Sequence, residues 1–275
     1  MSAKVVVDND APSQLDSTSP VVSDEQVGRR TALYLEGPGG PIFAWLHEPP
    51  VGRSLRHGVV VCPSLGYEQL HAHRTLRHLA EEAAKQGATV LRIDYHGTGD
   101  SPGHDLESGR VECWIENAQR AASWLRESGE VDRVTGIGFR AGALFALAAA
   151  ARQPADGVVL WAPPAKGNHF VREFRAVSMT AAATANLERR EGEPLETSGF
   201  RLSHETCVDI GKLNATDFVP RVRRALIVSR DESPTNSRLC DHLRAAQIEA
   251  TEVGGPGFAD IITLPHETRV PDTTL

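Results

Sequence analysis

Short apolar runs alternate with segments of helical periodicity along most of this sequence. The run at 58–63 ("GVVVCP") is apolar throughout, which is typical of a strand buried on both faces of a sheet. We expect further strands at 88–95, 134–139, 157–164, 224–232 and 248–255. Between them, apolar positions recur at helical spacing in 76–87, 111–128 and 235–247. This order predicts an α/β fold, with a mostly parallel sheet flanked by helices.

Three segments depart from that alternation. Residues 31–50 alternate on both sides of the glycine-rich turn at 37–40, which predicts a β-hairpin that adds antiparallel strands at one edge. Residues 1–28 are rich in Asp, Ser and Pro, so we expect a disordered acidic tail before a single domain over 29–275. Helical stretches and charged loops over about 165–217 predict a helical lid inserted after a strand.

Composition and charge narrow the classes of function. The 275-residue chain has a formal charge of −7, and its Lys and Arg residues are scattered, so we expect no nucleic-acid partner. The longest apolar run, 143–151, is far shorter than the ~20 residues that a membrane helix needs. The first residues lack a signal-peptide pattern, and the four widely spaced cysteines are typical of free thiols, so we expect a cytoplasmic protein.

The clearest motif is the turn inside "VTGIGFRAGALFALAAAA", residues 134–151. An apolar strand meets an Ala-rich helix at Gly138-x-Arg140-x-Gly142, the spacing at which serine hydrolases carry Gly-x-Ser-x-Gly and their nucleophile. A guanidinium stays protonated up to a pH above ~12, so Arg140 is neither a nucleophile nor a general base. An acyl-enzyme at Arg140 is therefore excluded.

Taken together, "VVVCPSLGY", "DYHGTGDSPG" and "GIGFRAGA" resemble the α/β-hydrolase fold over residues 31–271. Within this fold, the residues of these motifs most resemble the serine-aminopeptidase-like hydrolases, including those that are found with exosortase and with other biosynthetic clusters. This resemblance implies that Arg140 occupies the nucleophile position, and that the acid is Asp231, with Glu232 as its rival. It also implies His266 as the catalytic histidine. The implied oxyanion surroundings are Ser64, Leu65 and the backbone N–H of Ala141.

Two functions remain open at this stage. In the first, His266 and Asp231 form a base that acts without a covalent intermediate on an acyl or carbonyl substrate, such as an ester, a thioester or a related biosynthetic intermediate. Arg140, at a helix start, then clamps a carboxylate or an oxyanion. In the second, the chain is an inactive pseudo-hydrolase that binds a ligand or a protein partner, and Arg140 forms a structural ion pair, for example with Asp231 or Glu232. We favour the enzyme narrowly, because the acid and histidine candidates are retained.

Other motifs add little chemistry. In "HAHR", His71 and His73 lie two positions apart and do not share a helical face, so we expect no metal. The segment "HGTGDSPG" matches only two glycines of a nucleotide fingerprint, so we expect no cofactor, and Asp100 and Ser101 are expected to bond within their turn. The sequence ends nine residues past His266. The resemblance implies a last helix after this histidine that covers one face of the sheet. We therefore expect either a shortened chain, or a homodimer or partner protein that covers that face instead.

Overall fold

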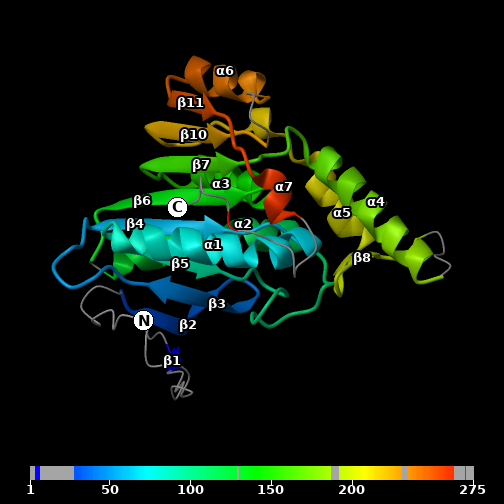
Figure 1. Cartoon of the computed structure of the whole chain (residues 1–275), viewed down its shortest axis with the longest axis horizontal. Coiled ribbons are helices and arrows are strands. Elements are labelled where there is room, and N and C mark those ends of the chain that lie inside the picture. The colour runs from blue at the N-terminus through cyan, green and yellow to red at the C-terminus, as the bar shows by residue number, and fades with distance from the viewer. Residues whose placement is uncertain are drawn as a thin grey trace, which may run out of the picture.

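A nine-stranded sheet organises the residues that the structure describes. The computed structural model describes residues 4–6, 28–128, 130–186, 192–230, 235–262 and 270. The strand order is β1-β2-β3-β5-β4-β6-β7-β10-β11. The parallel strands are β4 (His57–Cys62), β5 (Ala88–Ile93), β6 (Arg133–Phe139), β7 (Gly157–Trp161), β10 (Arg224–Val228) and β11 (Glu249–Val253). These strands confirm the predicted α/β architecture (Figure 1).

Antiparallel strands complete one edge of the sheet. The predicted hairpin is confirmed as β2 (Arg30–Gly37) and β3 (Gly40–His47), and β3 runs antiparallel to β5. A short β1 (Lys4–Val6) pairs with β2, within the segment that the composition assigned to a tail. The remaining residues of that segment up to 27 lie outside the described residues.

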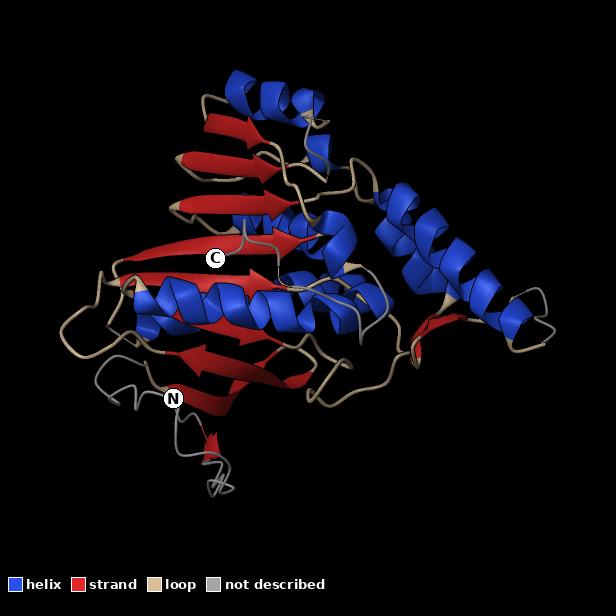
Figure 2. Ribbon diagram, viewed as in Figure 1, coloured by secondary structure: helices blue, strands red, loops and turns tan. Residues whose placement is uncertain are grey.

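Helices cover both faces of the sheet, because alternate strand residues point to opposite sides. On one face, Val59, Val61 and Val90 pack against α1 (Tyr67–Lys85) and α7 (Phe258–Ile261). On the other face lie α2 (Arg110–Glu127), α3 (Ala141–Arg152) and α6 (Ser237–Ala245). This three-layer arrangement is visible in Figure 2. No described helix combines the length and the apolar character that crossing a bilayer requires.

The insertion after β7 lies beyond the carboxyl ends of the parallel strands (Figure 1). It contains α4 (Gly167–Thr184), β8 (Leu195–Thr197), β9 (Phe200–Leu202), α5 (His204–Lys212) and a 3₁₀ turn, η2 (Ala215–Asp217). Its helices agree with the predicted pattern, whereas the β8–β9 hairpin has strands of three residues each, too short for a visible period of two. The insertion therefore brings side chains from α4 and from this hairpin to the end of the sheet where α/β proteins carry their sites.

Candidate functional site

The turn between β6 and α3 is sharp and tightly packed. Arg140 has φ 52° and ψ −119°, a conformation that residues with a Cβ rarely adopt. A Cβ on Gly138 would lie 2.4 Å from the Ala143 Cα, and a Cβ on Gly142 would lie 2.2 Å from the Cys62 carbonyl oxygen. Glycine at both positions therefore lets α3 approach β4 and β6, and the turn aims Arg140 at the carboxyl edge of the sheet.

The Arg140 guanidinium is surrounded by acceptors from its own chain. Its Nε donates to Glu68 Oε1 at 2.8 Å, its Nη1 donates to the Ala162 carbonyl at 3.3 Å, and its Nη2 donates to Glu173 Oε2. Glu68 comes from the first turn of α1, and Glu173 comes from α4 of the insertion. Only 4% of the Arg140 side chain is exposed. The side chain thus joins the sheet, α1 and the insertion.

Further partners extend this cluster. Ser64 Oγ donates to Glu68 Oε2 at 2.6 Å, and Arg230 Nη1 donates to Glu173 Oε1 at 3.2 Å. We call Arg140, Glu68, Glu173, Arg230 and Ser64 the Arg140 network. Two guanidinium groups face two carboxylates in it, so its formal charge is zero. The Phe258 ring lies 5.7 Å from the Arg140 guanidinium carbon and 4.8 Å from that of Arg230.

Electrostatics favour a permanently charged Arg140. Burial lowers the pKa of its guanidinium, but the nearby carboxylates of Glu68 and Glu173 reverse that effect, so the pKa is raised. Burial also raises the pKa of the neighbouring Tyr67 phenol well above its usual value, and the charge of Glu68 adds to that rise. The network is therefore an ionic cluster in which the buried charges of Arg140 and Glu68 and the partly exposed charges of Glu173 and Arg230 compensate one another.

The structure brings together four of the six residues predicted for the site. Arg140, Ser64, Leu65 and Ala141 converge at the β6–α3 turn, and all four are buried. Among the described residues, no acceptor is within hydrogen-bonding range of the Leu65 or Ala141 backbone N–H. Asp231, its rival Glu232 and His266 lie outside the described residues, as does any pair they form with Arg140.

Sequence reasoning missed the two carboxylates that hold Arg140. Glu68 lies in "GYEQL", and the predicted helix began only at residue 76, so its inward position in α1 was hidden. The sequence feature that could have revealed Glu68 is its place in the first turn of a helix that packs on the sheet. Its side chain is buried there, with 1% of the residue exposed. Glu173 lies in the insertion, where no periodicity fixed an orientation. Neither partner could be assigned from spacing alone.

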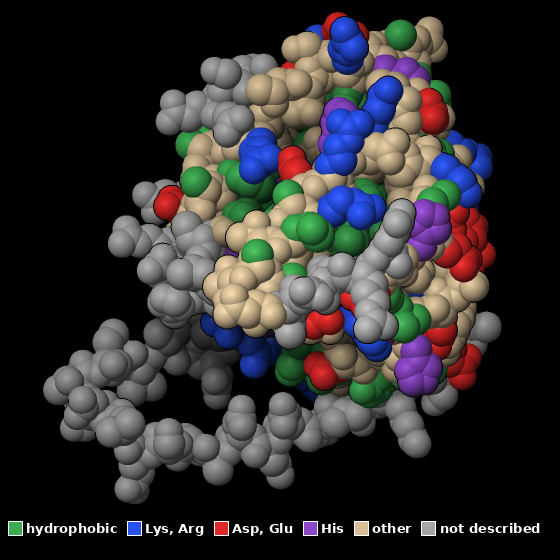
Figure 3. Space-filling view, turned by 90° about the vertical axis from the view of Figure 1, so that its right-hand side faces the viewer, with side chains coloured by type: hydrophobic (Ala, Val, Ile, Leu, Met, Phe, Trp, Pro, Cys, Tyr) green, Lys and Arg blue, Asp and Glu red, His purple; other side chains and the backbone are tan. Residues whose placement is uncertain are grey.

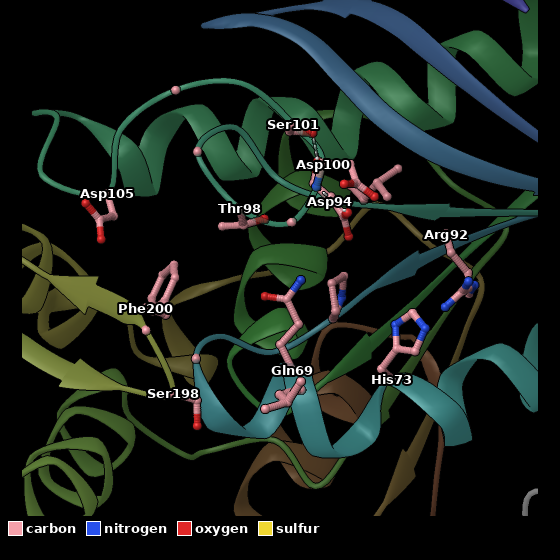
Figure 4. A pocket seen from close by; sticks show the side chains of 18 of the residues that line it. Gln69, His73, Arg92, Asp94, Thr98, Asp100, Ser101, Asp105, Ser198 and Phe200 are labelled. Atoms are coloured by element: carbon pink, nitrogen blue, oxygen red, sulfur yellow. Dashed lines mark hydrogen bonds between the residues drawn. The ribbon is translucent and has the colours of Figure 1, made fainter. Parts of the chain in front are cut away.

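A second region, the α1 cleft, lies between α1, the carboxyl end of β5 and the loop that follows it. It encloses about 560 Å³. Its polar lining residues include Gln69, His73, Arg92, Asp94, Thr98, Asp100, Asp105 and Ser198. Figure 4 shows Gln69 and His73 on α1, across from Asp94 and Thr98, with Arg92 at one end and Phe200 at the other. Arg140 does not line this cleft, so the two regions are distinct.

The loop wall of the α1 cleft is held in place by hydrogen bonds. Ser101 Oγ donates to the Asp94 carbonyl at 2.6 Å and accepts from the Phe43 N–H at 2.8 Å. The Asp100 N–H donates to Asp94 Oδ2 at 3.0 Å. A Cβ on Gly99, at φ +52°, would lie 2.1 Å from that same oxygen, so only glycine fits there. The expected bonding of Asp100 and Ser101 within their turn is confirmed, and it fixes the position of the Asp94 carboxyl.

Two ties connect this loop to its surroundings. Arg110, with 1% of its surface exposed, donates to the carbonyls of Asp105, Arg201 and Gly97 at 2.6, 3.2 and 3.2 Å. The Arg201 guanidinium in turn contacts both carboxyl oxygens of Asp105, at 2.9 and 3.0 Å. The β8–β9 hairpin is thereby fastened to the loop, and the cleft is largely preformed.

The outer face at this end of the sheet carries side chains of both signs. Figure 3 looks onto it and shows basic, acidic and histidine side chains. Within the described part of the chain, no group of three metal-ligating side chains is placed to hold an ion.

Comparison with known structures identifies the class of fold. Est1E from Butyrivibrio proteoclasticus, solved with ferulic acid, matches with a TM-score of 0.60 and 18% identity, covering 80% of this chain and 88% of that one. The hypothetical protein PA2218 from Pseudomonas aeruginosa matches with a TM-score of 0.60 and 15% identity over 98% of both chains. The Pyrococcus furiosus esterase PF2001 matches with a TM-score of 0.56 and 16% identity, covering 94% of this chain and 93% of that one. The chain has the α/β-hydrolase fold.

The family follows from the sequence itself. The family described as "Serine aminopeptidase, S33" matches residues 59–200, just over half of the chain. The chain belongs to this family. Among curated proteins, none gives a significant match. The matched region contains the β6–α3 turn, Glu68, Glu173 and most of the α1 cleft.

Proposed function

We propose that this chain is a member of the S33 family that binds a small molecule in the α1 cleft and forms no acyl-enzyme at the β6–α3 turn. Arg140 stands at the turn position where a serine hydrolase carries its nucleophile. The observation that carries the proposal is the state of Arg140: buried, and bonded to three acceptors of its own chain. A guanidinium in this state neither attacks a carbonyl nor holds a free face toward an incoming ligand.

Ligand binding is assigned to the α1 cleft because it combines room and polar lining groups with a position at the carboxyl end of β5. Its volume of about 560 Å³ is within the range of small-molecule sites. Its walls are fixed by the Asp94 and Arg110 hydrogen bonds before any ligand arrives. Preformed polar walls lower the entropic cost of binding.

The first test asks whether any serine becomes acylated. We expect a fluorophosphonate probe, read by intact-protein mass spectrometry, to leave the wild type unlabelled. The matched variant is Arg140→Ser combined with Glu68→Gln, which restores a hydroxyl at the turn without leaving a buried carboxylate unpaired. Labelling of the wild type at Ser64 or any other serine would contradict the proposal.

The second test asks where a ligand binds. Thermal shift with a panel of small carboxylates, phosphates, sugars and neutral esters should give stabilisation that disappears in Gln69→Trp, which fills the cleft. Arg74→Gln, a change at an exposed side chain on the same helix that does not line the cleft, serves as the control. Stabilisation that survives Gln69→Trp would place the ligand elsewhere and overturn the assignment.

A second candidate function keeps catalysis, with His266 and Asp231 as a non-covalent base and Arg140 as an anion clamp. The observation that favours it is that the unbonded N–H groups of Leu65 and Ala141 lie beside Arg140, as an oxyanion site requires. Arg230, the residue before Asp231, also belongs to the Arg140 network. For the clamp to act, Glu173 has to leave Nη2 and a substrate anion has to replace it.

This candidate predicts turnover that depends on both titrating residues. Wild-type hydrolysis of a thioester or ester should fall at least about 100-fold in both His266→Ala and Asp231→Asn, in line with the usual contribution of a general base. Because no acyl-enzyme forms, the probe would still fail to label. Absence of turnover, or turnover unchanged by both variants, removes this candidate and leaves the binding function.

A further inference from the structure

Arg92 is a partly buried cation that forms no ion pair with any of the described residues. It lies near the carboxyl end of β5, and its Nε donates to His47 Nε2 at 3.3 Å, a neutral acceptor. Among the described residues, no carboxylate lies within ion-pair distance of Arg92, and its two Nη groups donate to none of them. Burial lowers the pKa of the guanidinium to about 10, although the charge of Asp94, which forms no ion pair with Arg92, acts in the opposite direction. An uncompensated charge of this kind favours an anion from outside the chain.

The surroundings of Arg92 are rich in positive charge. Arg30 and Arg77 both lie close enough to lower the Arg92 pKa further, and Glu81, their ion-pair partner, is 3.9 Å from the former and 3.4 Å from the latter. Arg30 and Arg77 thus share the Glu81 carboxylate, and Asp94 is the other carboxylate whose charge acts on Arg92. Burial first, and these arginines second, lower the pKa of His47 to about 3. Three guanidinium groups therefore act against two carboxylates, Asp94 and Glu81, so positive charge is in excess at this end of the α1 cleft.

The Arg92 guanidinium faces the α1 cleft. Figure 4 shows the Arg92 guanidinium beside the His73 imidazole, which projects from α1, and both side chains line the cleft. Asp94 lies just past the end of β5, two residues after Arg92, and its side chain also lines the cleft. Asp94 is an acceptor for a donor group on whatever binds at Arg92.

We propose that the end of the α1 cleft formed by Arg92 and His73 binds the carboxylate or phosphate group of a small organic anion whose hydroxyl or amino group donates to Asp94. Arg92 supplies two unbonded Nη groups, a planar arrangement that matches both oxyanions. His73 supplies a ring N–H on the facing helix. This inference rests on the proposed binding function and names the chemical class of its ligand.

The test uses three anions at constant ionic strength: acetate, glycolate and inorganic phosphate. Binding is followed by NMR through the imidazole signals of His73 in the full-length protein. We expect saturable shifts, with glycolate binding more tightly than acetate because its hydroxyl donates to Asp94. The Arg92→Gln variant should raise the dissociation constants about tenfold or more, the usual weight of a hydrogen bond to a charged group. The preference for glycolate should vanish in Asp94→Asn.

Controls separate a built site from general charge screening. Arg74→Gln removes the same charge from the exposed residue next to His73 on α1 and should change each dissociation constant less than twofold. Circular dichroism and the melting temperature establish that each variant is folded. Tighter binding of phosphate than of both carboxylates identifies a phosphate ester, and the reverse identifies a carboxylate.

Other outcomes overturn the inference. Dissociation constants that are equal in the wild type and Arg92→Gln, or that rise equally in Arg74→Gln, show that no anion is held by Arg92. If neutral esters alone give stabilisation that Gln69→Trp abolishes, the binding function stands and the anion site is wrong. If Gln69→Trp abolishes nothing in that panel, the binding function itself has failed.

Discussion

Arg140 and Arg92 are two inward-facing arginines at the same end of one sheet, and their partners differ completely. Arg140 meets two carboxylates and a carbonyl, and the pKa of its guanidinium is raised. Arg92 meets one neutral imidazole among the described residues, and its pKa is lowered to about 10. The first charge is compensated inside the chain, while the second is left open to the α1 cleft.

The difference in partners indicates a structural role for Arg140 and a ligand-binding role for Arg92. Glu68 and Glu173 compensate the Arg140 charge, so their removal would expose a buried imbalance rather than create a useful site. Within the part of the chain that the structure describes, Arg92 has no such ion-pair partners, although burial makes its charge costly. A buried arginine that is paired with carboxylates holds structural elements together. An arginine that has no such pair and lines a cleft is placed to bind an anion from outside the chain.

The largest expected effect is on stability. Arg140→Met should lower the free energy of unfolding by about 3–5 kcal/mol, because it leaves the buried Glu68 carboxylate unpaired. Arg92→Met should change it by less than about 1 kcal/mol in either direction, since no carboxylate loses its partner. Urea denaturation at pH 7 measures both. Equal losses in the two variants would erase the contrast between the arginines.

A double variant sharpens that result. Adding Glu68→Gln to Arg140→Met removes the orphaned charge and should recover a substantial part of the lost stability. Failure to recover any would mean that the cost of Arg140→Met lies in packing, and that the ion pair is not its cause.

The next effect concerns pH and the positive end of the cleft. His47 has a pKa near 3 in the folded chain against 6.5 in the unfolded chain, so the unfolded chain alone binds its proton as the pH falls through 6.5. This contribution to stability is present above pH 6.5 and shrinks by about 2 kcal/mol between pH 7 and pH 5. In His47→Gln, the loss of unfolding free energy over that range should be smaller by this amount. An identical loss in both proteins would show that His47 titrates normally.

The smallest effect is a shift in one imidazole. Burial lowers the pKa of His73, and the charge of Arg92 lowers it further, followed by that of Arg77. Arg92→Gln should therefore raise the His73 pKa, as followed by NMR titration in the absence of added anions. Arg74→Gln provides the comparison, because Arg74 is not among the charges that lower this pKa. A larger rise in Arg74→Gln than in Arg92→Gln would remove Arg92 from the environment of His73.

The sheet could be predicted because buried strands and amphipathic helices carry their period in adjacent residues. The β6–α3 turn was predictable for a similar reason, since Gly138 and Gly142 flank it closely. The partners of Arg140 were not, because Glu68 and Glu173 are 72 and 33 positions away from it in sequence. Only the folded sheet and the insertion bring these side chains together.

The α1 cleft shows a second limit of sequence reasoning. The spacing of the two histidines in "HAHR" predicts no metal site and says nothing else about His73. In the fold, His73 lies beside Arg92 of β5, and no local spacing reveals that contact. The roles of Asp231 and His266 remain predictions. Local pattern therefore fixes where a strand ends, and tertiary contacts decide what the side chains at that end can do.

The backbone conformation of Arg140 has a consequence for how such turns are interpreted. A non-glycine residue at φ 52° and ψ −119° costs on the order of 1–3 kcal/mol, and this chain maintains it around a residue that cannot attack a carbonyl. The shape is sustained by the close approach of α3 to β4 and β6 at Gly138 and Gly142. A three-dimensional template built on that backbone alone would therefore carry no information about the residue type at the apex of the turn. The diagnostic information is in the side chain at the apex and in the two glutamates that contact it.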